Sequence, residues 1–226
     1  MRKKALDAAG ELLQAPADAL DIVDGEVVRM DRSAGPSISL SKLARYLAPG
    51  AKTLGDREPG LAAEGWFRVE HQVYPYGSHV ALVRVDGETG GVTVERYYIA
   101  YDIGRAINPA LVEAQIVGGY AQGLGGALFE EFIYNERGDP LAVTFADYLL
   151  PAVHETPAPQ VLLREDYTTP RNPLGIKGAG ESGITAVGAA IASAIDDAIG
   201  MPGAVTQIPV TPQRLRQILS KRAARE

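Results

Sequence analysis

The sequence contains no cysteine among its 226 residues, and this absence excludes several kinds of site. A chain without thiols forms no disulfide bond and cannot bind zinc or an iron–sulfur cluster through cysteine. Histidine is also scarce, and its three occurrences lack the spacing of a metal site, so we expect His71, His79 and His154 to be structural. We therefore predict that no side chain of this sequence is a metal ligand.

Long apolar runs and an excess of positive charge are missing as well. No stretch approaches the roughly 20 apolar residues that a membrane span needs, and residues 1–5 lack the apolar core of a signal peptide. The formal net charge is −6, which does not favour nucleic acid or an anionic membrane as a partner. We expect a soluble, cytoplasmic protein that binds neither nucleic acid nor a membrane.

What the sequence does contain predicts an α+β fold of mixed helices and β-hairpins in two lobes. In residues 1–65, an amphipathic helix over 3–14 precedes a hairpin signal at Asp24-Gly25. A second helix is expected to begin near Ser39 or Ser41, because either side chain can cap it. Residues 50–65 have no periodicity and are predicted to connect this small lobe to a larger one, residues 66–226.

The larger lobe alternates hairpin, strand and helix patterns. β-rich runs at 79–85 and 92–101 flank a glycine-containing turn, and a short strand is expected at 161–163. Helices are predicted at 110–129, at 184–199 and after Thr211-Pro212. The first two of these helices are rich in small and apolar residues, so we expect them to be the most buried.

The predicted helix at 110–129 is unusual in its glycine content. Each glycine inside a helix costs about 1 kcal/mol relative to alanine. This helix contains Gly118, Gly119, Gly123, Gly125 and Gly126. Tight packing against another backbone would account for them, and so would a cofactor lying against the helix. The sequence alone leaves both explanations open.

Residues 172–183 form a glycine-rich loop that precedes a helical pattern starting at Ile184. Glu181 would then lie near the start of a buried helix, where backbone N–H groups favour anions. The simplest interpretation is that Glu181 caps this helix. Residues 178–183 also fit the G-x-G-x-x-G dinucleotide fingerprint, but residues 168–173 do not have the pattern of the strand that this fingerprint requires.

A third interpretation of the loop is a family resemblance. The sequence Asn-Pro-Leu-Gly-Ile-Lys-Gly-Ala-Gly-Glu-Ser-Gly at 172–183 resembles the C-terminal signature of the xanthine dehydrogenase, aldehyde oxidase and carbon monoxide dehydrogenase family of molybdenum hydroxylases. Further stretches that resemble this family are 76–80, 102–105, 107–109, 115–119, 122–125 and 147–151. The resemblance covers nearly the whole chain, but only the C-terminal part of a large subunit that is several times longer.

The resemblance implies a chemistry and a set of cofactors. Enzymes of this family hydroxylate an electron-poor carbon of an aldehyde or a nitrogen heterocycle, with water as the oxygen source. They use a molybdopterin cofactor, here expected in its cytosine dinucleotide form. Electrons would leave through 2Fe-2S clusters and FAD on an iron–sulfur subunit and a flavin subunit. An upstream molybdopterin-binding half would complete the site, so we expect the isolated chain to be inactive.

The resemblance also assigns roles to individual residues. Glu181 would be the general base that removes a proton as the new carbon–oxygen bond forms. The residues expected at the cofactor are Gln115, Gly118, Gly119, Lys177, Gly178 and Gly180. Lys177 could pair either with a cofactor phosphate or with a carboxylate elsewhere in the loop. The alternative to a catalytic subunit is a non-catalytic assembly subunit, or a fragment, that keeps the fold.

Overall fold

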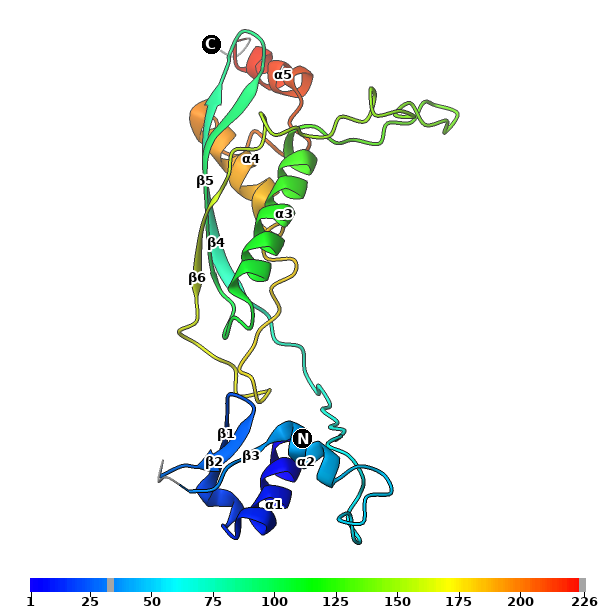
Figure 1. Ribbon diagram of the computed structural model, residues 1–226. Helices are drawn as coiled ribbons and strands as arrows, with labels where there is room; N and C mark the ends of the chain where they lie inside the picture. Colours follow the sequence, from blue (N-terminus) through cyan, green and yellow to red (C-terminus); the bar gives the residue numbers. More distant parts are fainter. Residues whose placement is uncertain (32–34, 224–226) are drawn as a thin grey trace. The chain divides into compact units, whose positions relative to one another are not determined.

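A computed structural model describes residues 1–31 and 35–223 of the chain (Figure 1). It divides into two compact units, Met1–Arg68 and Val69–Glu226. The sequence places the boundary at 65/66, within the extended segment that joins the two units. That the second unit is a cofactor-binding lobe stays a prediction at this point.

The first unit combines two helices with a small antiparallel sheet of order β1-β2-β3. Its elements are α1 (Arg2–Leu13), a 3-10 turn (Ala17–Ala19), β1 (Leu20–Val23), β2 (Glu26–Arg29), β3 (Ile38–Ser39) and α2 (Leu40–Tyr46). Asp24 and Gly25 make the β1–β2 turn with φ of 49° and 80°, as the Asp-Gly signal predicts. Ser39 accepts a hydrogen bond from Lys42 N at 3.3 Å and caps α2.

The second unit is built on a three-stranded sheet of order β4-β5-β6. Strands β4 and β5 are antiparallel, whereas β6 lies parallel to β5. Its elements are β4 (Tyr76–Val85), β5 (Val92–Asp102), α3 (Pro109–Leu128), β6 (Gln160–Arg164), α4 (Val187–Ala198) and α5 (Pro212–Ala223). Each unit contains both helices and strands, so the predicted α+β class is confirmed.

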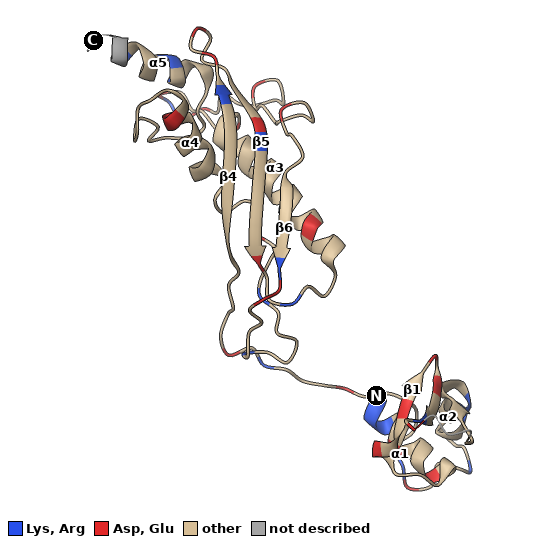
Figure 2. Ribbon diagram, turned by 90° about the vertical axis from the view of Figure 1, so that its left-hand side faces the viewer, with Lys and Arg blue, Asp and Glu red and all other residues tan. Residues whose placement is uncertain are grey.

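The core of the second unit lies between the sheet and the helices α3 and α4. Alternate residues of β4, including Ala81, Val83 and Val85, pack against this core, while Val80 and Leu82 point to solvent. Helix α3 carries a single charged side chain, Glu113, in keeping with its packed position (Figure 2). The fully buried side chains of the two helices are Ile116, Tyr120, Leu124, Ala127, Val187, Ile191 and Ile195.

The glycines of α3 have different surroundings, and at Gly125 an added Cβ would collide with the Glu130 carboxylate. A Cβ on Gly119 would lie 3.0 Å from Ile184 N, and one on Gly123 would lie 2.7 Å from Val187 Cβ. These two positions therefore need glycine, because the backbone of residues 183–184 and the first residue of α4 pack directly on α3. A Cβ on Gly118 or Gly126 would meet nothing within 4 Å. Tight packing thus explains only part of the glycine content.

Helix α4 begins at Val187, later than the expected start at Ile184. Residues 180–186 form successive turns instead, in which Ile184 N donates to Glu181 O at 3.2 Å and Val187 N to Ile184 O at 3.2 Å. These three-residue hydrogen bonds are tighter than those of an α-helix. Glu181 therefore lies in a turn before the helix and not at its N-terminus, which corrects the sequence-based placement.

The dinucleotide alternative is wrong. The fingerprint requires a strand that leads directly into the first glycine and a helix that follows it. Strand β6 ends at Arg164, and turns and irregular backbone occupy the residues between it and Gly178. Residues 178–183 therefore lack the strand–loop–helix geometry that binds a dinucleotide.

A long arm, residues 130–159, connects α3 to β6 and projects from the second unit (Figure 1). It contains the predicted turn at 135–139, closed by a bridge between Tyr134 and Pro140. Tyr148 donates a hydrogen bond to Glu130 at 2.7 Å at the base of the arm. The exposed apolar side chains of the arm include Phe132, Phe145 and Val153, with exposed fractions of 63%, 80% and 81%.

Candidate active-site loop

The first half of the glycine loop is attached to the segment that follows β5. Lys177 N donates to Ile103 O at 3.0 Å, and Arg105 N donates to Gly175 O at 3.1 Å. Within the loop, the Asn172 side chain bonds both main-chain groups of Ile176, at 2.8 and 3.0 Å. These contacts satisfy the polar backbone of the loop and fix its path up to residue 177.

A buried ion pair secures this attachment. Lys177 Nζ lies 2.8 Å from Asp102 Oδ1, with side-chain exposures of 8% and 6%. Asp102 also accepts hydrogen bonds from Gly104 N at 2.9 Å and Tyr167 N at 3.2 Å. Burial alone would raise the pKa of Asp102, but the hydrogen bonds from Lys177 and the backbone outweigh it and lower the pKa.

Lys177 therefore has a carboxylate partner, but one outside its own loop. Asp102 is the last residue of β5, and the ammonium group also lies 4.3 Å from the centre of the Tyr76 ring. Burial disfavours the charged form of Lys177, yet its hydrogen bond with Asp102 raises its pKa overall. A contact of Lys177 with a cofactor phosphate stays a prediction, and it would have to share an ammonium group that already serves Asp102.

Glu181 is in the opposite situation. Its residue is exposed, and its carboxylate makes no hydrogen bond or ion pair with any residue that the structure describes. Its main chain is nevertheless held, because its carbonyl accepts from Thr185 Oγ1 at 2.7 Å and from Ile184 N at 3.2 Å. A free carboxylate on a fixed backbone is what a general base requires.

A cavity of about 540 Å³ lies beside the Glu181 turn. Gly178 and Gly180 also line it, and a Cβ on Gly180 would meet nothing within 4 Å. The other lining residues are Gln72, Val73, Tyr74, Pro75, Tyr101, Ala179, Ser182 and Thr185. The loop thus leaves room for a bound group next to an unpaired carboxylate.

The remaining residues expected at the cofactor lie on α3. Gly119 packs on Gly183 and Ile184 and so connects α3 to the Glu181 turn. Gln115 and Gly118 are exposed and do not line the cavity. The structure therefore brings Lys177, Gly178, Gly180, Glu181 and Gly119 together and leaves Gln115 and Gly118 on an open face of the helix.

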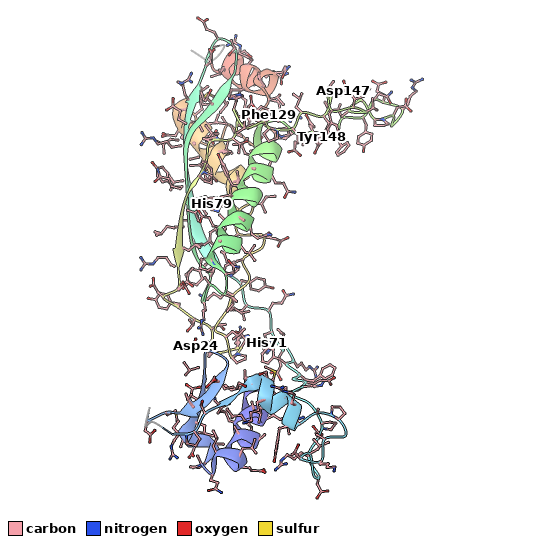
Figure 3. The ribbon with its side chains drawn as sticks, viewed as in Figure 1. Asp24, His71, His79, Phe129, Asp147 and Tyr148 are labelled. Carbon is pink, nitrogen blue, oxygen red and sulfur yellow. The ribbon has the colours of Figure 1, made fainter. Side chains whose placement is uncertain are left out.

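Two features of the site were not expected from the sequence. Asp102 was not considered as a partner, and His79 was expected to be merely structural. His79 projects from β4, and its Nε2 lies 3.2 Å from the carbonyl oxygen of Ser182, next to Glu181 (Figure 3). His79 was detectable as a polar side chain on the same face of β4 as Ala81, Val83 and Val85, whereas nothing comparable marks Asp102 at the end of β5.

The described residues contain neither a cluster of metal-binding side chains nor a membrane-spanning helix. Within residues 1–31 and 35–223, no group of three or more His, Cys, Asp or Glu side chains could hold a metal ion. No helix in the same residues is long and apolar enough to cross a membrane.

Comparison with known proteins assigns the family. Residues 1–157 match the family of molybdopterin cofactor-binding domains. The chain belongs to the molybdenum hydroxylase family. It is 41% identical over 213 residues to the gamma subunit of the 6-hydroxypseudooxynicotine dehydrogenase complex of Paenarthrobacter nicotinovorans. It is 30% identical over 217 residues to the nicotine 6-hydroxylase large subunit of the same organism.

A solved structure of the molybdenum hydroxylase family has a similar fold. The reconstituted CO dehydrogenase from Oligotropha carboxidovorans has a TM-score of 0.86 and is 26% identical, covering 99% of this chain and 27% of that one. The two curated relatives cover 94% and 95% of this chain, so their alignments include the Glu181 loop. The chain spans only 27% and 26% of their lengths, about a quarter of each.

Proposed function

We propose that this chain supplies the general base, Glu181, of a molybdenum hydroxylase that oxidises a nitrogen heterocycle or an aldehyde with water as the oxygen source. The observation that carries this proposal is the unpaired Glu181 carboxylate, held on a fixed turn beside a cavity. The two curated relatives support a heterocyclic substrate, because their names give nicotine and a nicotine-derived compound.

The reaction sets the task of Glu181. Hydroxylation converts R–H and water into R–OH, two protons and two electrons. Bond formation to the carbon is favoured if a proton leaves the attacking oxygen at the same time, and a positioned carboxylate typically contributes 10²- to 10⁴-fold. Glu181 takes that proton, while Lys177, four residues earlier in the loop, is paired with Asp102 and not with Glu181. A lysine paired with Glu181 would instead hold it as an inert carboxylate.

The site is suited to a molybdopterin cofactor on its open side. When bound, this cofactor would supply the oxygen-transfer and two-electron redox chemistry. Gly178 and Gly180 would let it approach the loop backbone closely, since no side chain of these residues fills the cavity. Gln115 and Gly118, on the exposed face of α3, would contact a part of the cofactor that extends along the helix. The cytosine dinucleotide form is part of this proposal.

The proposed enzyme needs further chains or domains. The chain has no cysteine to ligate 2Fe-2S clusters, so these would reside on an iron–sulfur subunit, and the family resemblance implies FAD on a flavin subunit. The exposed apolar side chains of the arm support docking to an upstream molybdopterin-binding half. Purified alone, the chain should contain little molybdenum and show no turnover. Stoichiometric metal in an active monomer would contradict this part of the proposal.

Replacing Glu181 by glutamine tests the proposed base. The change keeps the shape of the side chain and removes its ability to take a proton. In the assembled complex, Glu181→Gln should lower turnover by about 100-fold or more, with molybdenum content unchanged. Glu88→Gln, the same change in the exposed β4–β5 turn, is the matched control and should be neutral. Normal turnover of Glu181→Gln with cofactor bound would refute the proposal.

A further inference from the structure

His79 makes two hydrogen bonds that leave its ring only one neutral form. The carbonyl oxygen of Ser182 can only accept, so Nε2, at 3.2 Å, must carry the proton. Nδ1 of the neutral ring is then an acceptor, and the Tyr97 hydroxyl at 3.0 Å donates to it. Two consecutive hydrogen bonds therefore run from the Tyr97 hydroxyl through the His79 ring to the carbonyl of Ser182 in the Glu181 turn.

Packing holds the rings of both Tyr97 and His79 in place. Tyr97 is 1% exposed and its ring packs 4.5 Å from that of Tyr120 on α3. His79 pairs with Ile99 across the sheet, so Tyr97 and Tyr101 lie diagonally on either side of it. Their rings meet the imidazole edge-on, at 5.7 and 5.6 Å between centroids. The imidazole therefore has little freedom to turn away from Ser182.

The electrostatic surroundings keep the ring neutral. Burial lowers the pKa of His79, and the bond to Ser182 offsets this only in part. Burial also raises the pKa of Tyr97, so its hydroxyl stays protonated and can donate. In the part of the chain that the structure describes, no charged side chain forms an ion pair or hydrogen bond with His79.

The opposite side of the Glu181 turn is fixed by packing. A Cβ on Gly183 would collide with the carbonyl oxygen of Ile116, so the turn lies directly on the backbone of α3. The Glu181 side chain itself has no partner among the described residues, so only the backbone from which it extends is held by these contacts. Two side chains of the sheet reach the described residues 179–186 through polar groups, His79 at the Ser182 carbonyl and Tyr101 at the Thr185 side chain.

We propose that His79 is a positioning residue for Glu181: its Nε2–H holds the Ser182 carbonyl and thereby sets where the neighbouring carboxylate lies. This rests on the proposed role of Glu181, but the positioning itself can be measured without cofactor. A histidine that only filled space would leave the turn unchanged when replaced by an apolar side chain of similar size. A positioning histidine is replaceable by a side chain that keeps the donor.

Hydrogen exchange of the 226-residue chain tests this directly. In His79→Leu, amides of residues 182–187 should exchange roughly tenfold faster, as expected for the loss of one hydrogen bond. His79→Gln, whose amide can donate to the same carbonyl, should restore slow exchange. His154→Leu, at an exposed position in the same unit, should have no effect. Equal protection in His79→Leu and wild type would overturn the proposal, as would uniform loosening that includes β5.

A second measurement observes the ring of His79 in the wild-type chain, with Tyr97→Phe for comparison. Nitrogen-15 spectra of the imidazole at pH 7.5 should show the neutral form protonated at Nε2. Tyr97→Phe removes the donor to Nδ1 but keeps the Ser182 carbonyl that fixes this form, so its ring should also stay protonated at Nε2. A wild-type ring protonated at Nδ1 could not donate to Ser182 and would overturn the proposal. Neither result depends on turnover, so His79 can fail as a positioning residue while Glu181 remains the base.

Discussion

Two charged residues of one loop, Lys177 and Glu181, have opposite surroundings. Lys177 is buried and bound to Asp102, whereas Glu181 is exposed and has no partner among the described residues. The two residues are only four positions apart, so the burial and the pairing of a charged side chain differ over a short stretch of this loop. The loop thus has a start that is anchored through Lys177 and a tip at which the Glu181 carboxylate is unpaired among the described residues. A charge can be structural or chemical depending on what the rest of the fold places beside it.

The largest effect on the free energy of unfolding is expected from breaking the Lys177–Asp102 ion pair. Lys177→Met leaves Asp102 buried without its counter-charge, and such a loss typically costs about 3–5 kcal/mol in the free energy of unfolding. Arg84→Met provides the control, because its pair with Glu95 in the same unit is exposed, and should cost less than about 1 kcal/mol. Urea denaturation of both variants measures the difference. Similar small losses in the two would show that Lys177 is no anchor.

A smaller effect is expected where the turn packs on α3. In Gly183→Ala the new methyl group would press on the carbonyl of Ile116, and overpacking of this kind typically costs about 1–3 kcal/mol. The measurement is again the free energy of unfolding in urea. A neutral result would mean that the Glu181 turn does not rest closely on α3.

Much of this arrangement could be predicted from local sequence patterns. The β4–β5 hairpin, helix α3 and the Asp24-Gly25 turn follow from periodicity and turn chemistry, whereas the role that the loop motif assigns to Glu181 stays a prediction. The Lys177–Asp102 pair could not be predicted, because its members are 75 positions apart and nothing local joins them. The start of α4 was also missed, since packing of Gly183 on α3 rather than helix propensity decides the conformation of residues 180–186.

The pH dependence of stability should report on His79. Its pKa is lowered in the folded chain, so the unfolded chain binds more protons between the two pKa values. Its contribution is complete above the unfolded value of about 6.5 and is lost as the pH falls below it. Stability should therefore decline from pH 7.5 to 5, with a shallower slope in His79→Gln than in His154→Gln. Identical slopes would contradict a buried, neutral His79.

The smallest effect on folding is expected at the free tip. A methyl group on Gly180 would enter open space, so Gly180→Ala should change the free energy of unfolding by less than about 0.5 kcal/mol. In the assembled complex, the same methyl group would face the cavity and should reduce molybdenum content. A clear loss of stability in the isolated chain would instead place Gly180 with the packed glycines.

The pH profile of the chemical step tests the central claim, that Glu181 is the base, most directly. Single-turnover rates of the assembled complex should fall toward acid pH in the wild type, because a protonated carboxylate cannot accept a proton. In Glu181→Gln, the residual rate should be slow and lack this acid limb, with molybdenum content unchanged. An acid limb of the same shape in Glu181→Gln would show that another group takes the proton.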